Sequence, residues 1–221
     1  MSRWLWAIIA VSVPSTVAFA DDYRVDPAVG NSTFTAIFDA SLGERITANS
    51  AQVACDLQLD ETTNTASGVC SVPLTSIRVD NEDTKTEHFG QWATNKKTEP
   101  KSCRFEAKFS GVKMSHALVP EKPTPFAADV PFTICGRSRT DGGKEKVTGT
   151  AVLFPAGTYG SAKILRIRAK VEAFNRDRYQ IGPKYTSGWF ARVQSLAKIV
   201  AEEGTIELTL FAKALPAGGG K

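Results

Sequence analysis

Four stretches of the sequence alternate between apolar and polar residues, and this alternation is the feature that most constrains the fold. A period of two places all apolar side chains of an extended strand on one face and all polar ones on the other. Such strands are typical of antiparallel sheet with one buried and one solvated face. The apolar members are Val53, Cys55, Leu57 and Leu59; Phe105, Ala107 and Phe109; Leu165, Ile167, Ala169 and Val171; and Ile206, Leu208 and Leu210.

Turn-forming clusters separate these stretches, at Asp60–Asn64, Asp141–Gly143 and Pro155–Gly157. Several long antiparallel strands in one domain leave exposed edges unless the sheet closes into a barrel. The sequence therefore predicts an all-β antiparallel barrel. A barrel of eight strands either fills its interior with side chains or holds one small ligand, and periodicity does not choose between these outcomes. We expect a short helical segment only at Trp189–Ala201, where apolar residues have helical spacing.

Both ends of the chain differ from the domain between them. Residues 1–20 have a basic Arg3, an apolar run over Trp4–Val13 and a small-x-small ending at Ala18–Ala20, which predicts a removed signal peptide. The apolar run is too short to span a bilayer, so no stable membrane anchor is expected. We expect one domain over residues 21–215 and a disordered, glycine-rich tail over residues 216–221.

The charge of the chain argues against one class of partner. Lys and Arg total 27 against 23 Asp and Glu, a net charge of +4 that is spread along the sequence. A nucleic-acid-binding domain usually gathers its basic residues on one face. We therefore expect no nucleic acid partner, whereas a homodimer is compatible with the composition.

The segment 74–105 contains an ordered series of signals. A strand with Leu74 and Ile77 is followed by Asn81-Glu82-Asp83, then Glu87-His88 with an apolar neighbour, then a second strand after Pro100. Three further blocks follow the same order as in one known family, and together the blocks span about residues 23 to 213. These blocks are Tyr23–Pro27 with Asn31–Ala36, Val130–Gly136 and Phe174–Gly182.

With these blocks the chain resembles the YceI-like polyisoprenoid-binding family. The family commonly has a histidine where this chain has Cys135. The resemblance implies an extended, eight-stranded, lipocalin-like barrel with a long apolar tunnel that holds an isoprenoid chain. Residues that could line this tunnel are Phe34, Phe38, Phe105, Phe109 and Phe132, although a filled core would use the same residues.

Four polar residues are candidates for contact with a ligand headgroup. Guanidinium groups match the oxygens of a phosphate, and His88 lies near the expected tunnel mouth. The alternative is that the two charged triplets, Asn81–Asp83 and Asn175–Asp177, only brace their loops with hydrogen bonds. The candidates are Arg78, His88, Arg176 and Arg178.

The four cysteines predict two disulfides. Residues that face each other in an antiparallel hairpin have position numbers with a constant sum, and the turn near Thr62 places Cys55 opposite Cys70. The loop centred on Val119 similarly places Cys103 opposite Cys135. Four cysteines allow three full pairings, and an exported chain favours disulfides. Metal binding is the rival interpretation, but the sequence has no C-x-x-C pair.

Catalytic motifs are absent from the sequence. It contains no G-x-S-x-G, no H-E-x-x-H and no glycine-rich phosphate loop. We expect a periplasmic or secreted protein without cofactor or metal that binds a polyisoprenoid or quinone-like chain as a carrier, store or stress-related binder. One alternative is a small enzyme for an apolar substrate, with His88 and either Glu82 or Asp177 as acid and base. Another is a ligand-free structural or stress-related barrel.

Overall fold

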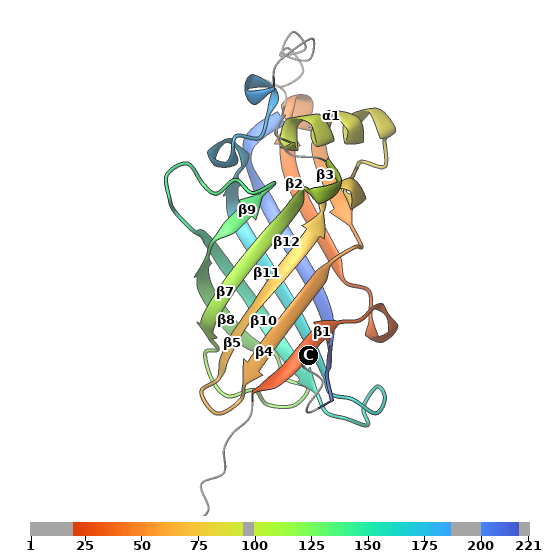
Figure 1. Cartoon of the computed structure of the whole chain (residues 1–221), viewed down its shortest axis with the longest axis vertical. Helices are drawn as coiled ribbons and strands as arrows, with labels where there is room; N and C mark the ends of the chain where they lie inside the picture. The colour runs from red at the N-terminus through yellow and green to blue at the C-terminus, as the bar shows by residue number, and fades with distance from the viewer. Residues whose placement is uncertain (1–19, 95–99, 187–199, 217–221) are drawn as a thin grey trace, which may run out of the picture.

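The computed structural model describes residues 20–94, 100–186 and 200–216, and twelve strands form most of this part of the chain (Figure 1). The predicted signal peptide, apart from Ala20, and the predicted tail, apart from Pro216, lie outside the described residues. The strands are β1 (Asp21–Val25), β2 (Thr33–Ala40), β3 (Arg45–Ser50), β4 (Ala54–Asp60), β5 (Thr65–Pro73), β6 (Arg78–Val79), β7 (Arg104–Lys113), β8 (Thr124–Val130), β9 (Phe132–Ile134), β10 (Glu145–Phe154), β11 (Ile164–Asn175) and β12 (Val200–Ala214).

The twelve strands form eight antiparallel barrel segments. Four of these segments are interrupted once, and each of the four therefore consists of two strands. Within the described residues, β1 and β2 form segment 1, β3 and β4 segment 2, β5 and β6 segment 3, and β8 and β9 segment 5. Strands β7, β10, β11 and β12 are segments 4, 6, 7 and 8. Each segment pairs with the next along the chain, and β12 pairs with both β1 and β2. The ring is therefore closed, and the predicted eight-stranded antiparallel barrel is confirmed.

The breaks have local causes. Pro131 separates β8 from β9, since proline has no N–H to give to a ladder. The 3-10 turn η1 (Pro27–Val29) separates β1 from β2, and η3 (Leu74–Ser76) separates β5 from β6. The strand expected at Leu74 is thus wrong at that residue, because Leu74 donates to the carbonyl of Cys103 and its own carbonyl accepts from Ile77, which closes the turn.

The single α-helix of the described residues, α1 (Asp83–Ala93), covers one end of the barrel (Figure 1). The sequence prediction of a helix only at Trp189–Ala201 was wrong on this point, because Phe89, Trp92 and Ala93 also have helical spacing. Residues 189–199 of that prediction lie outside the described residues, and Val200 and Ala201 begin β12. The remaining short turns are η2 (Ser41–Gly43), η4 (Pro100–Ser102), η5 (Arg176–Tyr179) and η6 (Pro183–Tyr185).

Both predicted disulfides are formed. Cys55 and Cys70 face each other on β4 and β5, in the predicted register. Cys103 and Cys135 are also bonded, but they flank β7 and β9, whose register places Phe105 opposite Ile134 and so differs by one residue from the predicted alignment. Cys135 lies in a turn with a positive φ of 51°, beyond the last residue of β9.

Candidate ligand-binding site

Two adjoining cavities lie inside the barrel. The upper cavity, next to α1, has a volume of about 300 Å³, and the lower cavity has a volume of about 100 Å³. Phe34, Phe105 and Ile206 line both, so their side chains mark the junction between the cavities. The barrel interior is therefore not completely filled by its own side chains.

All five phenylalanines expected from the sequence line these cavities. Phe34 and Phe105 line both, Phe38 lines the upper cavity, and Phe109 and Phe132 line the lower one. Their alternation along β2, β7 and β9 turns each ring inward, because successive side chains of a strand point to opposite faces.

Aromatic packing defines the junction. The ring centroid of Phe105 lies 5.1 Å from that of Phe34, 5.1 Å from that of Phe132 and 6.2 Å from that of Phe174. Tilted and edge-to-face pairs at such distances are favourable beyond the apolar area that they bury. Phe174 also stacks on the buried Tyr179, with centroids 5.2 Å apart, which fixes the wall of the upper cavity.

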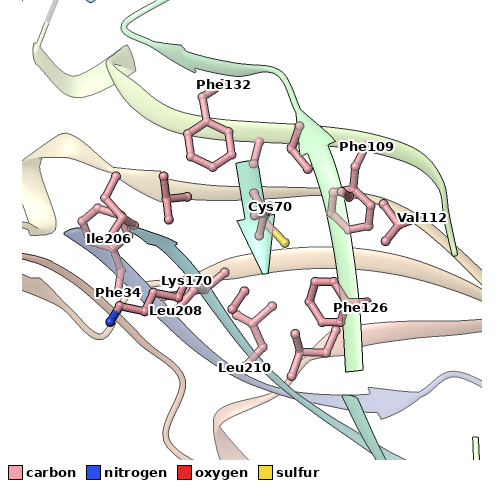
Figure 2. A pocket seen from close by; sticks show the side chains of 18 of the residues that line it. Phe34, Cys70, Phe109, Val112, Phe126, Phe132, Lys170, Ile206, Leu208 and Leu210 are labelled. Carbon is pink, nitrogen blue, oxygen red and sulfur yellow. The ribbon is translucent and has the colours of Figure 1, made fainter. Parts of the chain in front are cut away.

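The lower cavity is lined almost entirely by apolar side chains. Figure 2 shows the rings of Phe109, Phe126 and Phe132 arranged around the hollow, with Leu208 and Leu210 facing them from β12. Lys170 also lines this cavity, but its Nζ lies 3.0 Å from Oε1 of the exposed Glu172. The lining therefore offers little compensation for a buried charge and suits a hydrocarbon chain.

The upper cavity combines an apolar wall with a few polar side chains. Phe89 and Trp92 of α1 contribute aromatic surface that the sequence analysis had not assigned to the site. Their spacing of three residues on an otherwise polar stretch was the signal that could have revealed them. The polar side chains that line this cavity are Glu44, Lys85, His88 and Arg176.

Lys85 is already compensated by two carboxylates. Its Nζ lies 2.9 Å from Oε1 of Glu82 and 3.0 Å from Oδ2 of Asp80. Hydrogen bonds to Glu82 and Asp80 raise the pKa of Lys85 above its ordinary value. Lys85 therefore adds little uncompensated positive charge to the cavity.

Arg176 is buried and donates to three backbone carbonyls. Its Nε, Nη1 and Nη2 lie 3.1, 2.8 and 3.0 Å from the carbonyl oxygens of Ala201, Ile181 and Val200. Burial lowers the pKa of its guanidinium from the ordinary value. Gly182, with a φ of 146°, lies against this group, and a Cβ there would be 2.4 Å from Nη1. Arg176 thus braces the start of β12 while it lines the upper cavity.

The other two arginines expected at a headgroup lie elsewhere. Arg78 is exposed and forms an ion pair with Asp83 at the start of α1. Arg178 is half-exposed, and its Nε lies 3.7 Å from Oδ2 of Asp141. Neither contributes to the walls of the two cavities, whereas His88 and Arg176 do.

Contacts at both ends position α1. At its start, the backbone N–H of Val79 donates to Oγ1 of Thr86 at 2.9 Å. At its end, the Arg137 guanidinium donates to the carbonyl of Ala93 and, at 2.9 Å, to the carbonyl of Gln180. Arg137 was not recognised from the sequence, since a single arginine in a loop carries no periodic signal.

A buried polar network lies behind the stacked Tyr179. The Tyr179 hydroxyl donates to Oε1 of the buried Glu145 at 2.7 Å, and Nη1 of Arg139 lies 3.3 Å from the same oxygen. Burial and this hydrogen bond raise the pKa of Tyr179. Arg139 also binds both carboxylate oxygens of Asp141, at 2.9 and 2.7 Å. The network joins the loop before β10 to η5.

The described residues offer neither a cluster of metal ligands nor a membrane-spanning helix. No group of three or more His, Cys, Asp or Glu side chains in that part of the chain is placed to hold a metal ion. None of its helices is long and apolar enough to cross a membrane.

A search of solved structures supplies the deciding comparison. The chain matches a polyisoprenoid-binding domain from Saccharophagus degradans implicated in plant cell wall breakdown, with a TM-score of 0.53 and 12% sequence identity. The match covers 87% of this chain and 98% of that domain. The chain has the polyisoprenoid-binding-domain fold. No family model matches the sequence, and no curated protein matches it at the level of sequence.

Proposed function

We propose that this protein holds a lipid with a polyisoprenoid or quinone-like chain inside its barrel and catalyses no reaction. The observation that carries the proposal is the pair of adjoining, largely apolar cavities, whose linings share Phe34, Phe105 and Ile206. The shared fold with a polyisoprenoid-binding domain supports the same conclusion. A prenyl chain suits such a space because each buried methylene contributes about 0.8 kcal/mol.

The polar side chains indicate how the lipid would be oriented. Its apolar chain would occupy the lower cavity, and its polar end would lie in the upper cavity near His88 and Arg176. Lys85 is compensated by two carboxylates, and Glu44 adds a negative charge. Each nitrogen of the Arg176 guanidinium already donates to a backbone carbonyl, so a buried anion would be poorly compensated there. This balance favours an uncharged polar end, such as an alcohol or a quinone, over a diphosphate.

Features outside the cavities support a binding role in an oxidising compartment. Two disulfides are typical of exported proteins, so we propose a periplasmic or secreted carrier or store.

The carboxylates considered as catalytic partners of His88 are engaged elsewhere. Glu82 pairs with Lys85, and Asp177 accepts from Tyr185 at 2.8 Å and pairs with Lys184.

The direct test is mass spectrometry of an organic extract from the protein purified after export. We expect a prenyl lipid in stoichiometric amount, and its mass would identify the polar end. Titration of delipidated protein with geranylgeraniol should then give saturable binding. An empty extract together with absent binding would contradict the proposal and favour a ligand-free barrel.

The orientation has its own test. Wild-type protein and Arg176→Ala are titrated with geranylgeraniol and with geranylgeranyl diphosphate. We expect tighter binding of the alcohol by the wild type, and similar losses for both ligands in the variant if Arg176 acts mainly as a brace. A selective loss of the diphosphate would instead show a charge-assisted contact with Arg176, for which about 1.5–3 kcal/mol is typical.

A further inference from the structure

Barrel segments 1 and 2 are both interrupted at the same level of the wall. Their ladder runs as far as Phe34↔Ser50 between β2 and β3 and resumes at Arg24↔Asp56 between β1 and β4. Segment 1 uses more residues than segment 2 over this interval, and the surplus forms η1, which protrudes from the wall beside β1 (Figure 1). The wall therefore lacks a continuous strand pair at this level.

A groove occupies this gap on the outer surface. It has a volume of about 580 Å³, and most of the side chains along it, including those of Asn31 and Gln52, are exposed to solvent. We call it the side groove. Its lining residues are Arg24, Val25, Pro27, Gly30, Asn31, Ser32, Ala51, Gln52, Val53, Ala54, Cys55 and Asp56.

One valine separates the side groove from the barrel interior. Val53 is buried, with 7% of its surface exposed, and it lines both the groove and the lower cavity. Beside it lies the disulfide, since Cys55 lines the groove and its partner Cys70 lines the cavity. At this level segments 1 and 2 share no strand ladder, and the Val53 side chain closes the wall between them, beside the disulfide that cross-links β4 to β5.

The edges of the gap are held by specific hydrogen bonds. Ser32 Oγ accepts from the backbone N–H of Phe211 at 3.0 Å, and the N–H of Asp26 donates to the Phe211 carbonyl at 3.2 Å. On the other edge, Ser50 Oγ accepts from the N–H of Gln52 at 3.0 Å and lies 2.7 Å from Ser76 Oγ. The backbone is fixed on both sides, which leaves the Val53 side chain as the element that blocks the gap.

We propose that the gap at Val53 is a side portal through which the apolar chain of the bound lipid enters and leaves the lower cavity. The inference rests on the proposed lipid binding and adds the route. The opposite end of the interior is covered by α1, whose Phe89 and Trp92 face the upper cavity. Through a side route the end of the apolar chain would leave the lower cavity directly, and the polar end would follow it past the junction at Phe105.

The portal predicts that the size of residue 53 sets the exchange rate. Protein loaded with geranylgeraniol is mixed with excess phosphatidylcholine vesicles, and release is followed by tryptophan fluorescence. We expect Val53→Ala to accelerate release by about tenfold, which corresponds to a barrier lower by about 1.4 kcal/mol. Val53→Ile, a conservative change that preserves the fold, should slow release.

Val147 provides the matched control, because it lines the same cavity from β10 and does not line the side groove. Val147→Ala and Val147→Ile remove or add the same methyl groups, so their release rates should change only as far as their affinities do, whereas the Val53 variants should change release beyond what their affinities account for. Equal release rates for each matched pair would overturn the portal. Failure of the wild type to bind geranylgeraniol would overturn the proposed function itself and the portal with it.

Discussion

The side chain of Phe105 lies at the junction between the two cavities. It lines the upper and the lower cavity and has the rings of Phe34, Phe132 and Phe174 as neighbours. Its contacts make it part of the core, and its position also makes it the constriction that a long ligand has to pass beside. A change in the volume of this one side chain should therefore alter which chain lengths are bound.

We predict that Phe105→Trp shortens the range of ligands. In the wild type, affinity should rise from geraniol to geranylgeraniol as more methylenes are buried. The larger indole should close the junction, so the variant should not bind geranylgeraniol more tightly than geraniol. Overpacking should lower the free energy of unfolding by about 1–3 kcal/mol. Isothermal titration calorimetry with geraniol and geranylgeraniol measures this dependence on chain length.

The control for this prediction is Phe154→Trp. Phe154 is also aromatic, but it packs against Tyr159 with ring centroids 5.1 Å apart and does not line either cavity. It should retain the chain-length dependence of the wild type. A Phe105→Trp protein with an unchanged dependence would mean that ligands do not cross the junction.

Asp141 gives a pH-dependent prediction. Hydrogen bonds from Arg139, and then from the N–H of Gly143, lower the pKa of its carboxyl group in the folded state. Because this pKa is lower in the folded than in the unfolded state, the ionised carboxylate stabilises the fold at pH values above the unfolded-state pKa of about 3.9. This stabilisation is lost as the pH falls from there through the folded-state pKa. The Tm difference between wild type and Asp141→Asn should therefore be largest near neutral pH and should shrink below about pH 4.

Thermal unfolding followed by circular dichroism across this pH range provides the measurement. Asp129→Asn, at an exposed position on β8, serves as the control and should give a small difference from the wild type. A Tm difference for Asp141→Asn that stays constant from neutral to acidic pH would show that the ionised carboxylate does not support the loop before β10.

At the residue scale, the sequence best predicted positions in strands where apolar and polar residues alternate. The family resemblance suggested that the five phenylalanines line a tunnel, and alternation placed Phe105 and Phe109 on one face of their strand. The role of Arg137 could not be predicted, and for Arg176 bracing was expected as an alternative but its partners could not be. Both depend on carbonyls brought close by folding, namely Ala93 with Gln180 and Val200 with Ala201.

At the scale of elements, α1 differs from the strands in how it is attached. No strand ladder includes it, and it is held by Thr86 at its start and by Arg137 at its end. Its apolar side chains cover the upper cavity, so the helix closes the ligand space without contributing to the closed ring of segments. Its removal from the cavity should therefore affect binding more than folding.

We predict that Phe89→Ser combined with Trp92→Ser weakens lipid retention and leaves the barrel folded. Both side chains are only partly buried, and both line the upper cavity. Far-ultraviolet circular dichroism should remain that of the wild type, while the lipid recovered by organic extraction should fall. The control is Glu87→Ser with Gln91→Ser on the same helix, outside the cavity walls. Equal retention in the two double variants would contradict a covering role for α1.

The sequence could predict the elements only in part. Strands with strict alternation were found, and turns such as Asp60–Asn64 followed from their composition. Helix α1 was missed because it contains Gly90 and its N-cap residue, Glu82, makes no capping hydrogen bond through its side chain, so local propensity for it is weak. The break within segment 2 could not be predicted, because residues 51–53 contain no proline or glycine.

At the scale of the whole molecule, the barrel and its cavities follow from different kinds of information. Alternation indicated an antiparallel sheet, and the family resemblance supplied eight strands and a tunnel. The volumes of about 300 and 100 Å³ were not predictable, since the same phenylalanines could have packed into a filled core. Only the three-dimensional arrangement of all eight segments decides how much space remains.

The seam that closes the barrel has a consequence for the order of folding. Pairs such as Tyr23↔Ala214 join the first strand to the last, and contacts of such long sequence separation form slowly. Before β12 docks, segments 1 and 7 both present unpaired edges, which favour association with other chains. The barrel interior is therefore enclosed only after the 15 residues of β12 have paired with both neighbouring segments. A chain that ends before Val200 should remain an open sheet and aggregate.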